Sequence, residues 1–581
     1  MGYAHEYAAA IMQRGRIPME PADFVPDWAD RPRKAKYYPG VGAFPLPDTD
    51  YPAEATVAAG CLPARDLPAG DLPAGDPSAG PPGGPADERP AADRPFTLDT
   101  LSGMLRDSYG LTGRRLGVQT NTDLAALPHY AQANWSRGTA SGGGLYPVGV
   151  YWISGPSGPR APGIHYYSPP HHAMQRLIAG DMTGEVRAAL GEGAEGAAGP
   201  VGAAHDQFLV LGIKYWQNAF KYNSFSFHAV SMDLGAILQT WRIWARARGL
   251  KVEPALWFDE RRLSRLLGVD NEEEGVFAVV PLTWAGARPT APALSAAPAV
   301  RHTDSERSRT VLRFETLQRI HTATTEAATE RPLPGALAPA TNATPAGTGV
   351  TVALPAPELP PVSVRTALRT RRSSFGRFDA STPLTTGQLA AALAACAAAS
   401  LGSDAERPER AGQAGQSGHT GPADGTVRDR PATPGLVTLY AFVNHVEGVE
   451  PGAYAYDPAA HELRVVVPGP PGPFLQRNYF LSNYNLEQAG AVLVPTVRTT
   501  AVLDAVGDRG YRLVNGTIGA VAQTFYTAAS ALGLGAGVAL GFDNISYVEE
   551  LGLDRTGEDP LLIMLLGNER ARPADFRYEI A

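Results

Sequence analysis

A glycine-rich string, SRGTASGGGLYP at 136–147, offers an arginine, a hydroxyl and three successive glycines directly before an expected strand. Glycine lets backbone N–H groups approach a ligand closely, and such loops hold anionic or carbonyl oxygens. The candidate ligand-binding residues are Arg137, Ser141, Gly142 and Gly143. An ordinary glycine-rich turn explains the string equally well. The string lacks the GK[ST] ending of a phosphate loop and the G-x-S-x-G frame of a nucleophile elbow.

A second string, RTRRSSFGRF at 369–378, begins an expected helical segment. Arg371, Arg372 and Ser373 would place two guanidiniums and a hydroxyl at a helix N-terminus, where backbone N–H groups favour an anion. Taken alone, an arginine-rich helix start is more often a solvated surface.

A lysine and a tyrosine stand side by side in FKYNSFSFH, at 220–228, where a long helix is expected to open. Lys221 and Tyr222 could donate or accept a proton if desolvation lowers the pKa of the lysine. Such pairs also arise by chance, as Lys214 and Tyr215 just upstream illustrate.

The chain contains an internal duplication. Residues 234–260 align without gaps with residues 518–544, and close to half of the positions are identical. Upstream, GIHYYSPPHHAM at 163–174 aligns with GAYAYDPAAHEL at 452–463 in the same order. Shared helical propensity does not account for such a match, so we infer that a whole domain is repeated.

The two copies differ where chemistry is expected. Gly541, in LGFDN, would let a backbone N–H face a planar ligand, but its counterpart in the first copy is the bulky Trp257. Conversely, Lys221 in the first copy corresponds to Ala505 in the second. The two copies have therefore diverged at these positions.

Strands and small-residue-rich helices alternate in both copies, which predicts an α+β fold with mixed sheets. Pro-, Ala- and Gly-rich stretches predict disorder or loose order at 52–95, 285–300, 327–360 and 402–433, with an amphipathic helix around 305–322. The predicted division is an N-terminal arm (1–50), a disordered insertion (51–95), a first domain (96–286), a linker with one helix (287–357) and a second domain (358–572) with a flexible insertion (402–433).

Composition excludes several classes of protein. A formal net charge of −8 over 581 residues argues against a nucleic-acid partner. Only two cysteines are present, so a disulfide framework and a cysteine-based metal site are excluded, and no metal is expected. His171, His172 and His461 lie in tyrosine-rich turns and are expected to be structural. No signal-peptide or membrane-spanning pattern is seen, which predicts a soluble cytoplasmic protein without a membrane partner.

The motifs resemble the SagB-type thiazole/oxazole peptide dehydrogenases of the nitroreductase superfamily. The resemblance rests on PDWADRPRKAKYYPGVGAFPLP (26–47), LSGMLRDSYGLT (101–112) with SGGGLYP, and RRSS, RGYR (509–512) and GLGAGVALGFD in the second copy. It covers most of the chain outside the insertions. Two departures are Ala140, where the family has proline, and FSFH at 225–228, where it has Arg-Gly-Tyr-Arg.

The resemblance implies that the two domains form an intramolecular pseudo-dimer with FMN at their interface. The first copy would supply the glycine loop and the catalytic pair Lys221 and Tyr222. The second copy would supply Arg371, Arg372, Ser373 and Gly541, while its own loop is reduced to ATPGLV at 432–437. One FMN site per chain is therefore expected, with the mirror-related site lost.

The activity implied is FMN-dependent oxidation of thiazoline or oxazoline rings in a ribosomally made peptide, as in the biosynthesis of antibiotic peptides. The partners implied are an azoline-containing precursor peptide and a cyclodehydratase complex. Two alternatives stay open at this point. One is an NAD(P)H-dependent nitro or quinone reductase, and the other is a non-catalytic scaffold with a flavin-protein fold.

Overall fold

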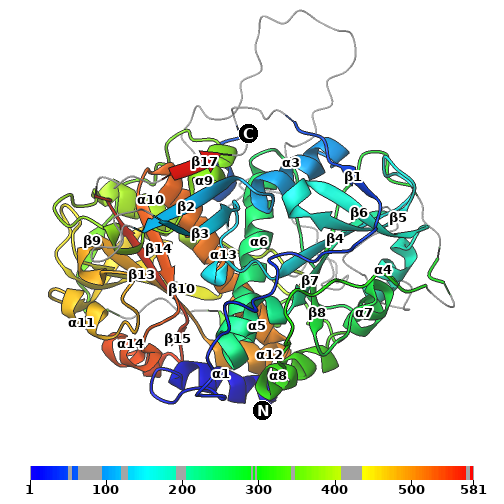
Figure 1. Ribbon diagram of the computed structural model, residues 1–581. Coiled ribbons are helices and arrows are strands. Elements are labelled where there is room, and N and C mark those ends of the chain that lie inside the picture. Colours follow the sequence, from blue (N-terminus) through cyan, green and yellow to red (C-terminus); the bar gives the residue numbers. More distant parts are fainter. Residues whose placement is uncertain are drawn as a thin grey trace, which may run out of the picture.

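The computed structural model describes residues 2–49, 55–62, 94–119, 129–191, 205–288, 292–294, 298–341, 347–406, 435–570 and 576–579. Within these ranges the chain forms two large sheets and one small one, with helices between and around them (Figure 1). All paired strands are antiparallel, not mixed as the sequence predicted. The side chains of 114–134 lie outside the description.

The first sheet is built from the N-terminal half of the chain. Its strand order is β1-β6-β5-β4-β7-β8, and all neighbours are antiparallel. Strands β4 and β7 are buried along their length apart from the last residue of β7, as expected of central strands covered on both faces. The strands are β1 (Ala43–Pro45), β4 (Val148–Ser154), β5 (Gly163–Ser168), β6 (Ala173–Ala179), β7 (Gln207–Lys214) and β8 (Glu274–Pro281).

The second sheet has the same arrangement. Its order is β9-β12-β11-β10-β13-β16-β14, with β15 (Asp559–Pro560) paired to β13. Matched strands of the two sheets thus occupy matched places, β4 with β10 and β7 with β13. The strands are β9 (Thr351–Ala353), β10 (Val437–Val443), β11 (Gly452–Asp457), β12 (Glu462–Pro468), β13 (Ala491–Val497), β14 (Gly535–Ala539) and β16 (Ile563–Gly567).

A small motif recurs in the corresponding turns of the two sheets. The hydroxyl of Tyr167 is 2.9 Å from Nδ1 of His172, and the hydroxyl of Tyr456 is 2.7 Å from Nδ1 of His461. Both histidines have positive φ angles, 43° and 51°. Each histidine is held by its tyrosine, in agreement with the structural role expected from the sequence.

The long helices α6 (Ser226–Arg246) and α13 (Gly510–Ala531) pack against each other between the two sheets (Figure 1). Their backbones approach so closely that a Cβ on Gly235 would collide with Gly516, and one on Gly519 would collide with Met232. Glycine is needed at these crossings because any side chain would push the helices apart. The duplicated helices therefore form the contact that joins the two halves.

The remaining elements cover the sheets and link the halves. They include α1 (Tyr3–Gln13), α3 (Leu98–Ser108), α4 (Thr183–Ala189), α5 (Trp216–Tyr222), α7 (Glu260–Leu267), α8 (Glu315–Glu326), α9 (Val364–Thr370), α10 (Thr386–Ala397), α11 (Gly472–Arg477), α12 (Thr499–Val506) and α14 (Asn544–Leu551). A three-stranded sheet is formed by β2 (Gly113–Gln119), β3 (His129–Ser136) and β17 (Phe576–Glu579).

Parts of the stretches expected to be loosely ordered are structured. Residues 57–61 form the short helix α2 (Val57–Cys61), which is capped by Thr56 and has buried Val57 and Cys61 side chains. Its apolar side chains pack beside α6, a burial that composition alone does not reveal. The rest of that insertion, 63–93, lies outside the described residues, as do 407–434.

The linker also differs from the prediction. Its helix α8 begins at Glu315 rather than near 305, because the residues before it make other contacts. Lys214 binds Asp304 at 2.7 Å and Glu306 at 2.6 Å, and this holds the segment against the first sheet. Further along, β9 pairs with β12 and so belongs to the second sheet, although the sequence placed it in the linker.

Candidate active site

The glycine loop of the first half is attached to α6 by a carboxylate. Ser141 Oγ donates to Asp233 Oδ2 at 2.7 Å, and the Gly142 N–H donates to Asp233 Oδ1 at 2.8 Å. Burial raises the pKa of Asp233 to about 7, although these two hydrogen bonds oppose the shift. Asp233 was not predicted from the sequence. It is the only acid in the long helix, and that was the signal that could have revealed it.

Lys221 and Tyr222 lie against this loop. Gly143 has a φ of 62°, and a Cβ there would lie 2.7 Å from the Tyr222 hydroxyl and 2.8 Å from Lys221 Nζ. The ammonium group is also 5.7 Å from the ring centroid of Trp28, which is half-exposed. Thus α5 delivers both expected proton-transfer groups to the glycine loop, and only glycine leaves room for them.

Arg371 connects the second half to the same loop. Its Nε donates to the Gly138 carbonyl at 2.8 Å and its Nη2 to the Arg137 carbonyl at 3.1 Å. The neighbouring Ser373 hydroxyl lies 2.8 Å from the hydroxyl of Tyr526, on α13. Arg372 is 2.6 Å from Glu569. The arginine-rich segment therefore follows the C-terminal end of α9, not a helix N-terminus as the sequence predicted, and it lies beside the loop.

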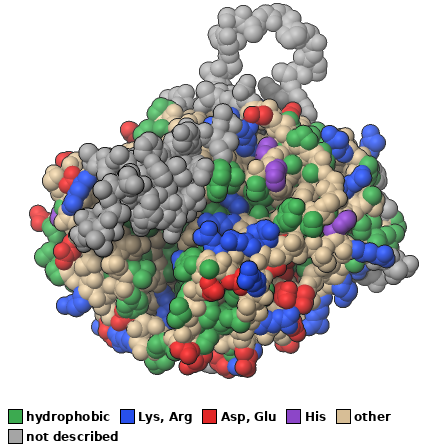
Figure 2. All heavy atoms as spheres, in the orientation of Figure 1, with side chains coloured by type: hydrophobic (Ala, Val, Ile, Leu, Met, Phe, Trp, Pro, Cys, Tyr) green, Lys and Arg blue, Asp and Glu red, His purple; other side chains and the backbone are tan. Residues whose placement is uncertain are grey.

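Arg137 is buried between two aromatic rings. Its guanidinium lies 4.4 Å from the ring centroid of Tyr109 and 4.3 Å from that of Tyr146, and it donates to the Lys34 carbonyl at 3.0 Å. Its Nη1 has no hydrogen-bond partner among the described residues. Burial, and then the charge of Arg137, lower the pKa of Lys34 to about 8. Figure 2 shows Lys and Arg side chains gathered near the middle of the face that it draws.

Gly541 lies just beyond the end of β14. Half-exposed Leu481 lies over it, 3.1 Å from where its Cβ would be. Arg14, at the end of α1, binds the Leu540 carbonyl and stacks 4.9 Å from the Phe225 ring centroid. Phe225 is in turn 6.2 Å from the ring of Tyr222. Gly541 is therefore linked to the glycine loop through these side chains and does not contact it directly.

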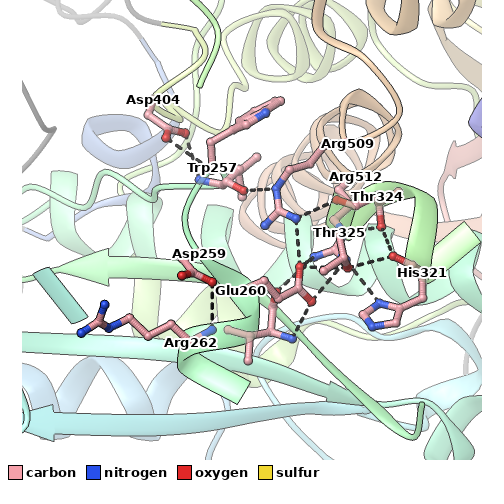
Figure 3. Close-up of polar contacts among 12 residues, drawn as sticks. Trp257, Asp259, Glu260, Arg262, His321, Thr324, Thr325, Asp404, Arg509 and Arg512 are labelled. Atoms are coloured by element: carbon pink, nitrogen blue, oxygen red, sulfur yellow. Dashed lines mark hydrogen bonds and ion pairs between the residues drawn. The ribbon is translucent and has the colours of Figure 1, made fainter. Parts of the chain in front are cut away.

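The mirror-related position in the first half is filled by buried side chains. Trp257 is 1% exposed. Beside it, Glu260 Oε2 accepts hydrogen bonds from Arg509 Nη1 and Arg512 Nη1, both at 2.9 Å. Figure 3 shows this cluster surrounded by His321, Thr324 and Thr325 of α8. Of the second-half loop expected to face it, 432–437, residues 432–434 lie outside the described residues.

The residues at the loop suit a planar cofactor that carries a phosphate. No described atom lies within 4 Å of the position that a Cβ on Gly144 would take, so this end of the loop borders open space among the described residues. Arg371, Arg372 and Ser373 lie beside the loop and bond there to loop carbonyls, Glu569 and Tyr526. Among the described residues, Arg137 Nη1 is a buried donor without a partner, the kind of group that an anionic oxygen satisfies. The donor set therefore fits FMN, the cofactor that the sequence resemblance implies.

Comparison with known proteins identifies the family of the second half. The model of the nitroreductase family matches residues 368–568. These residues form a nitroreductase-family domain. The match begins just before Arg371 and contains Gly541, so it spans the second-half part of the site.

A curated protein and a crystal structure, both named "putative nitroreductase", extend this result. The Methanocaldococcus jannaschii protein is 33% identical over 139 residues, which are 22% of this chain and 64% of the relative. The match therefore spans less than two thirds of the relative's length. The Anabaena variabilis ATCC 29413 structure has a TM-score of 0.63 at 20% identity and covers 98% of this chain and 100% of its own. The nitroreductase-like fold therefore extends over both halves.

One weaker structural match involves a peptide-modifying complex. A chain of the E. coli microcin synthetase McbBCD complex with truncated pro-MccB17 aligns at 20% identity and a TM-score of 0.26, covering 35% of this chain and 70% of its own. Likeness at that level supports no inference.

Membrane-spanning helices and clusters of metal ligands are both absent from the described residues. None of the helices there is long and apolar enough to cross a membrane. Nor do three His, Cys, Asp or Glu side chains in those ranges come together as metal ligands would.

Proposed function

We propose that this chain is an FMN-dependent dehydrogenase that oxidises thiazoline or oxazoline rings of a ribosomally made peptide to thiazoles or oxazoles. The observation that carries the proposal is the position of Lys221 and Tyr222 against Gly143, in the loop that Arg371 of the nitroreductase-family domain clamps. A proton-transfer pair and a complementary cofactor cradle thus meet at one interface between the halves. The resemblance in sequence supports the azoline substrate.

The cofactor would be held by groups from both halves. Gly142 and Gly143 would let the backbone approach the flavin ring, and Ser141 would fix the loop through Asp233. Arg371, Arg372 and Ser373 would face its anionic part, Arg137 would support the loop, and Gly541 would border the ring from the nitroreductase-family domain. FMN, when bound, supplies the acceptor for the two electrons of the oxidation.

The protein's own task is to position the ring and remove a proton. Lys221 is the proposed base and would take the proton from the ring carbon, while FMN, when bound, would accept the hydride that the same ring loses. The ring thereby loses two hydrogens in total and becomes aromatic, and O2 serves as the final electron acceptor. Tyr222 shares the proton with Lys221. The exposed Trp28 ring beside Lys221 provides an apolar surface for the flat azoline.

The first experiment measures flavin content. Purified protein is heated to release flavin, which is identified and counted per chain. We expect one FMN per chain, because the mirror-related position is filled by Trp257 and the Glu260 cluster. Two FMN molecules per chain would contradict the loss of the mirror-related site. No bound FMN, even after FMN is added, would refute the proposed enzymatic activity.

The second experiment tests the base. Lys221→Ala should lower azoline oxidation by about 10²-fold or more while one FMN stays bound, since general base catalysis contributes roughly 10²–10⁴. Tyr222→Phe should have a smaller effect. The matched control is Lys214→Ala, which removes a lysine bound to Asp304 and Glu306 outside the loop. Equal loss in both variants would refute the assignment of Lys221.

A third experiment separates oxidation of an azoline from reduction of a nitro group or quinone. The family description of residues 368–568 favours the latter as the second candidate. Mixing with NADH or NADPH under anaerobic conditions should leave the flavin oxidised, and the azoline peptide should bleach it. Rapid bleaching of the flavin by NAD(P)H, with no bleaching by the peptide, would favour the nitro or quinone reductase over the azoline dehydrogenase.

A further inference from the structure

A pocket that shares no lining residue with the glycine loop lies at the outer edge of the first sheet. It has a volume of about 260 Å³ and is lined by residues of β1, β5 and β6 and of the turn before β5. Since a water molecule occupies about 30 Å³ in the liquid, a small organic ion would fit there. The residues that give the pocket its chemistry are Phe44, Arg160, His165 and Arg176.

The pocket is positively charged. Arg160 and Arg176 contribute two exposed guanidiniums, and none of the lining residues is an acid. Within the described residues, neither arginine forms an ion pair. Guanidinium groups bind carboxylates and phosphates through paired, charge-assisted hydrogen bonds, so this pocket favours an oxyanion.

A buried histidine faces the same space. His165 is 1% exposed and lines the pocket. Hydrogen bonding with the backbones of Trp152 and Gly163 raises the pKa of its imidazole, but Nδ1 has no partner in good hydrogen-bond geometry among the described residues. Burial, and to a smaller extent Arg176, lower the pKa of His165 to about 4. The ring is therefore neutral at pH 7 and can offer one N–H. Buried polar atoms are usually satisfied, so an unpartnered nitrogen beside a pocket points to a ligand.

The sheet register fixes these groups in place. His165 is the cross-strand partner of Arg176 between β5 and β6, and Phe44 pairs with Met174 one strand further out. A row of rings leads to the pocket. Trp152 is 5.3 Å from His165, His165 is 5.6 Å from Phe44, and the Arg160 guanidinium stacks 4.4 Å from Phe44. Stacking on Phe44 orients the fork of Arg160, which lowers the entropic cost of binding an anion.

We propose that the pocket formed by Arg160, Arg176 and His165 is a binding site for a small oxyanion, a carboxylate or a phosphate. The two guanidiniums neutralise its charge, and the imidazole N–H contributes a third donor. The proposal concerns a site apart from the glycine loop and does not depend on the proposed function.

Calorimetric titration of the full-length protein as purified, with inorganic phosphate and separately with succinate at constant chloride, tests the site. We expect one of the two probes to bind, and to bind about tenfold more weakly or worse in Arg160→Gln and in Arg176→Gln, a loss of roughly 1.4 kcal/mol or more. The probe that binds decides between phosphate and carboxylate. Arg261→Gln, an exposed change of equal charge on α7, should leave the affinity unchanged.

A histidine variant provides an independent readout. His165→Phe retains a ring in the row but removes both nitrogens, so it should weaken binding while the melting temperature stays near that of the wild type. The proposal is overturned if neither probe binds the wild type, or if both arginine variants bind the probe with the affinity of the wild type. The latter result would place the binding elsewhere, for example at Arg371 and Arg372.

Discussion

At the scale of single residues, Asp233 decides how the glycine loop is held. Its carboxyl accepts from Ser141 and from the Gly142 N–H, and burial raises its pKa to about 7. The carboxyl of an aspartate in an unfolded chain has a pKa of about 3.9. The folded protein therefore keeps this proton over a pH range in which the unfolded chain has lost it. This contribution to stability is fully present below about pH 4 and is lost as pH rises through about 7.

Asp233→Asn should abolish that pH dependence. We expect the free energy of unfolding of the wild type, relative to the variant, to fall between about pH 4 and 7 by at most about 1.4 kcal/mol per pH unit, and then to level off. Urea unfolding at several pH values measures it, with the exposed Asp554→Asn as the control. Parallel curves for wild type and Asp233→Asn would show that the carboxyl titrates alike in both states.

At the scale of elements, the segment after α9 joins the two halves through Arg371. Its two hydrogen bonds end on carbonyl groups of the glycine loop, so the loop and the arginine segment form one unit. Arg371→Gln should destabilise the protein by about 2 kcal/mol, since hydrogen bonds to charged groups contribute roughly 1.5–3 kcal/mol. It should also weaken FMN binding, because the loop would no longer be fixed.

Arg371→Lys should restore little of either property, because an ammonium group cannot reproduce the fork. Urea unfolding and quenching of flavin fluorescence measure the two effects, with the exposed Arg555→Gln as the reference. Flavin affinity equal to the wild type in Arg371→Gln would separate the clamp from the cofactor site.

Sequence could predict these elements better than their contacts. The repeat of 234–260 at 518–544 implied matched sheets, and the observed strand orders agree. That Lys221 and Tyr222 lie near the start of the long helix was also readable, although they end α5 and α6 begins only at Ser226. Asp233 was not, because its role depends on a loop about ninety residues earlier in the chain folding onto α6. Nor was α2, whose burial against α6 is a tertiary effect that overrides its composition.

At the scale of the whole molecule, the two halves use the duplicated framework differently. In the nitroreductase-family domain, Arg14 of α1 binds the Leu540 carbonyl. At the matched place in the first half, Arg509 binds the Leu256 carbonyl and also Glu260. An arginine thus holds each strand end, but only in the first half does a buried carboxylate join it. That carboxylate ties together the first half, α13 and, through Thr325, the linker helix α8.

Glu260→Gln should therefore destabilise the entire fold. Burial alone would raise the pKa of Glu260, but the Arg512 and Arg509 guanidiniums lower it to about 2, so the carboxylate is charged in the folded protein at neutral pH. Its stabilising effect is present above about pH 4.3, the unfolded value, and is lost as pH falls toward 2. Removing the charge leaves two buried guanidiniums uncompensated, which costs about 3–5 kcal/mol.

Urea unfolding of Glu260→Gln at pH 7 measures this cost, and Glu549→Gln is the matched control. Glu549 makes an exposed pair with Arg16 at 3.4 Å, and such surface pairs contribute roughly 0–1 kcal/mol. If Glu260→Gln and Glu549→Gln lower the free energy of unfolding by the same small amount, the Glu260 cluster does not hold the two halves together. A large loss confined to Glu260→Gln, with FMN still bound at one per chain, would mean that the position matched to the flavin site now serves stability alone.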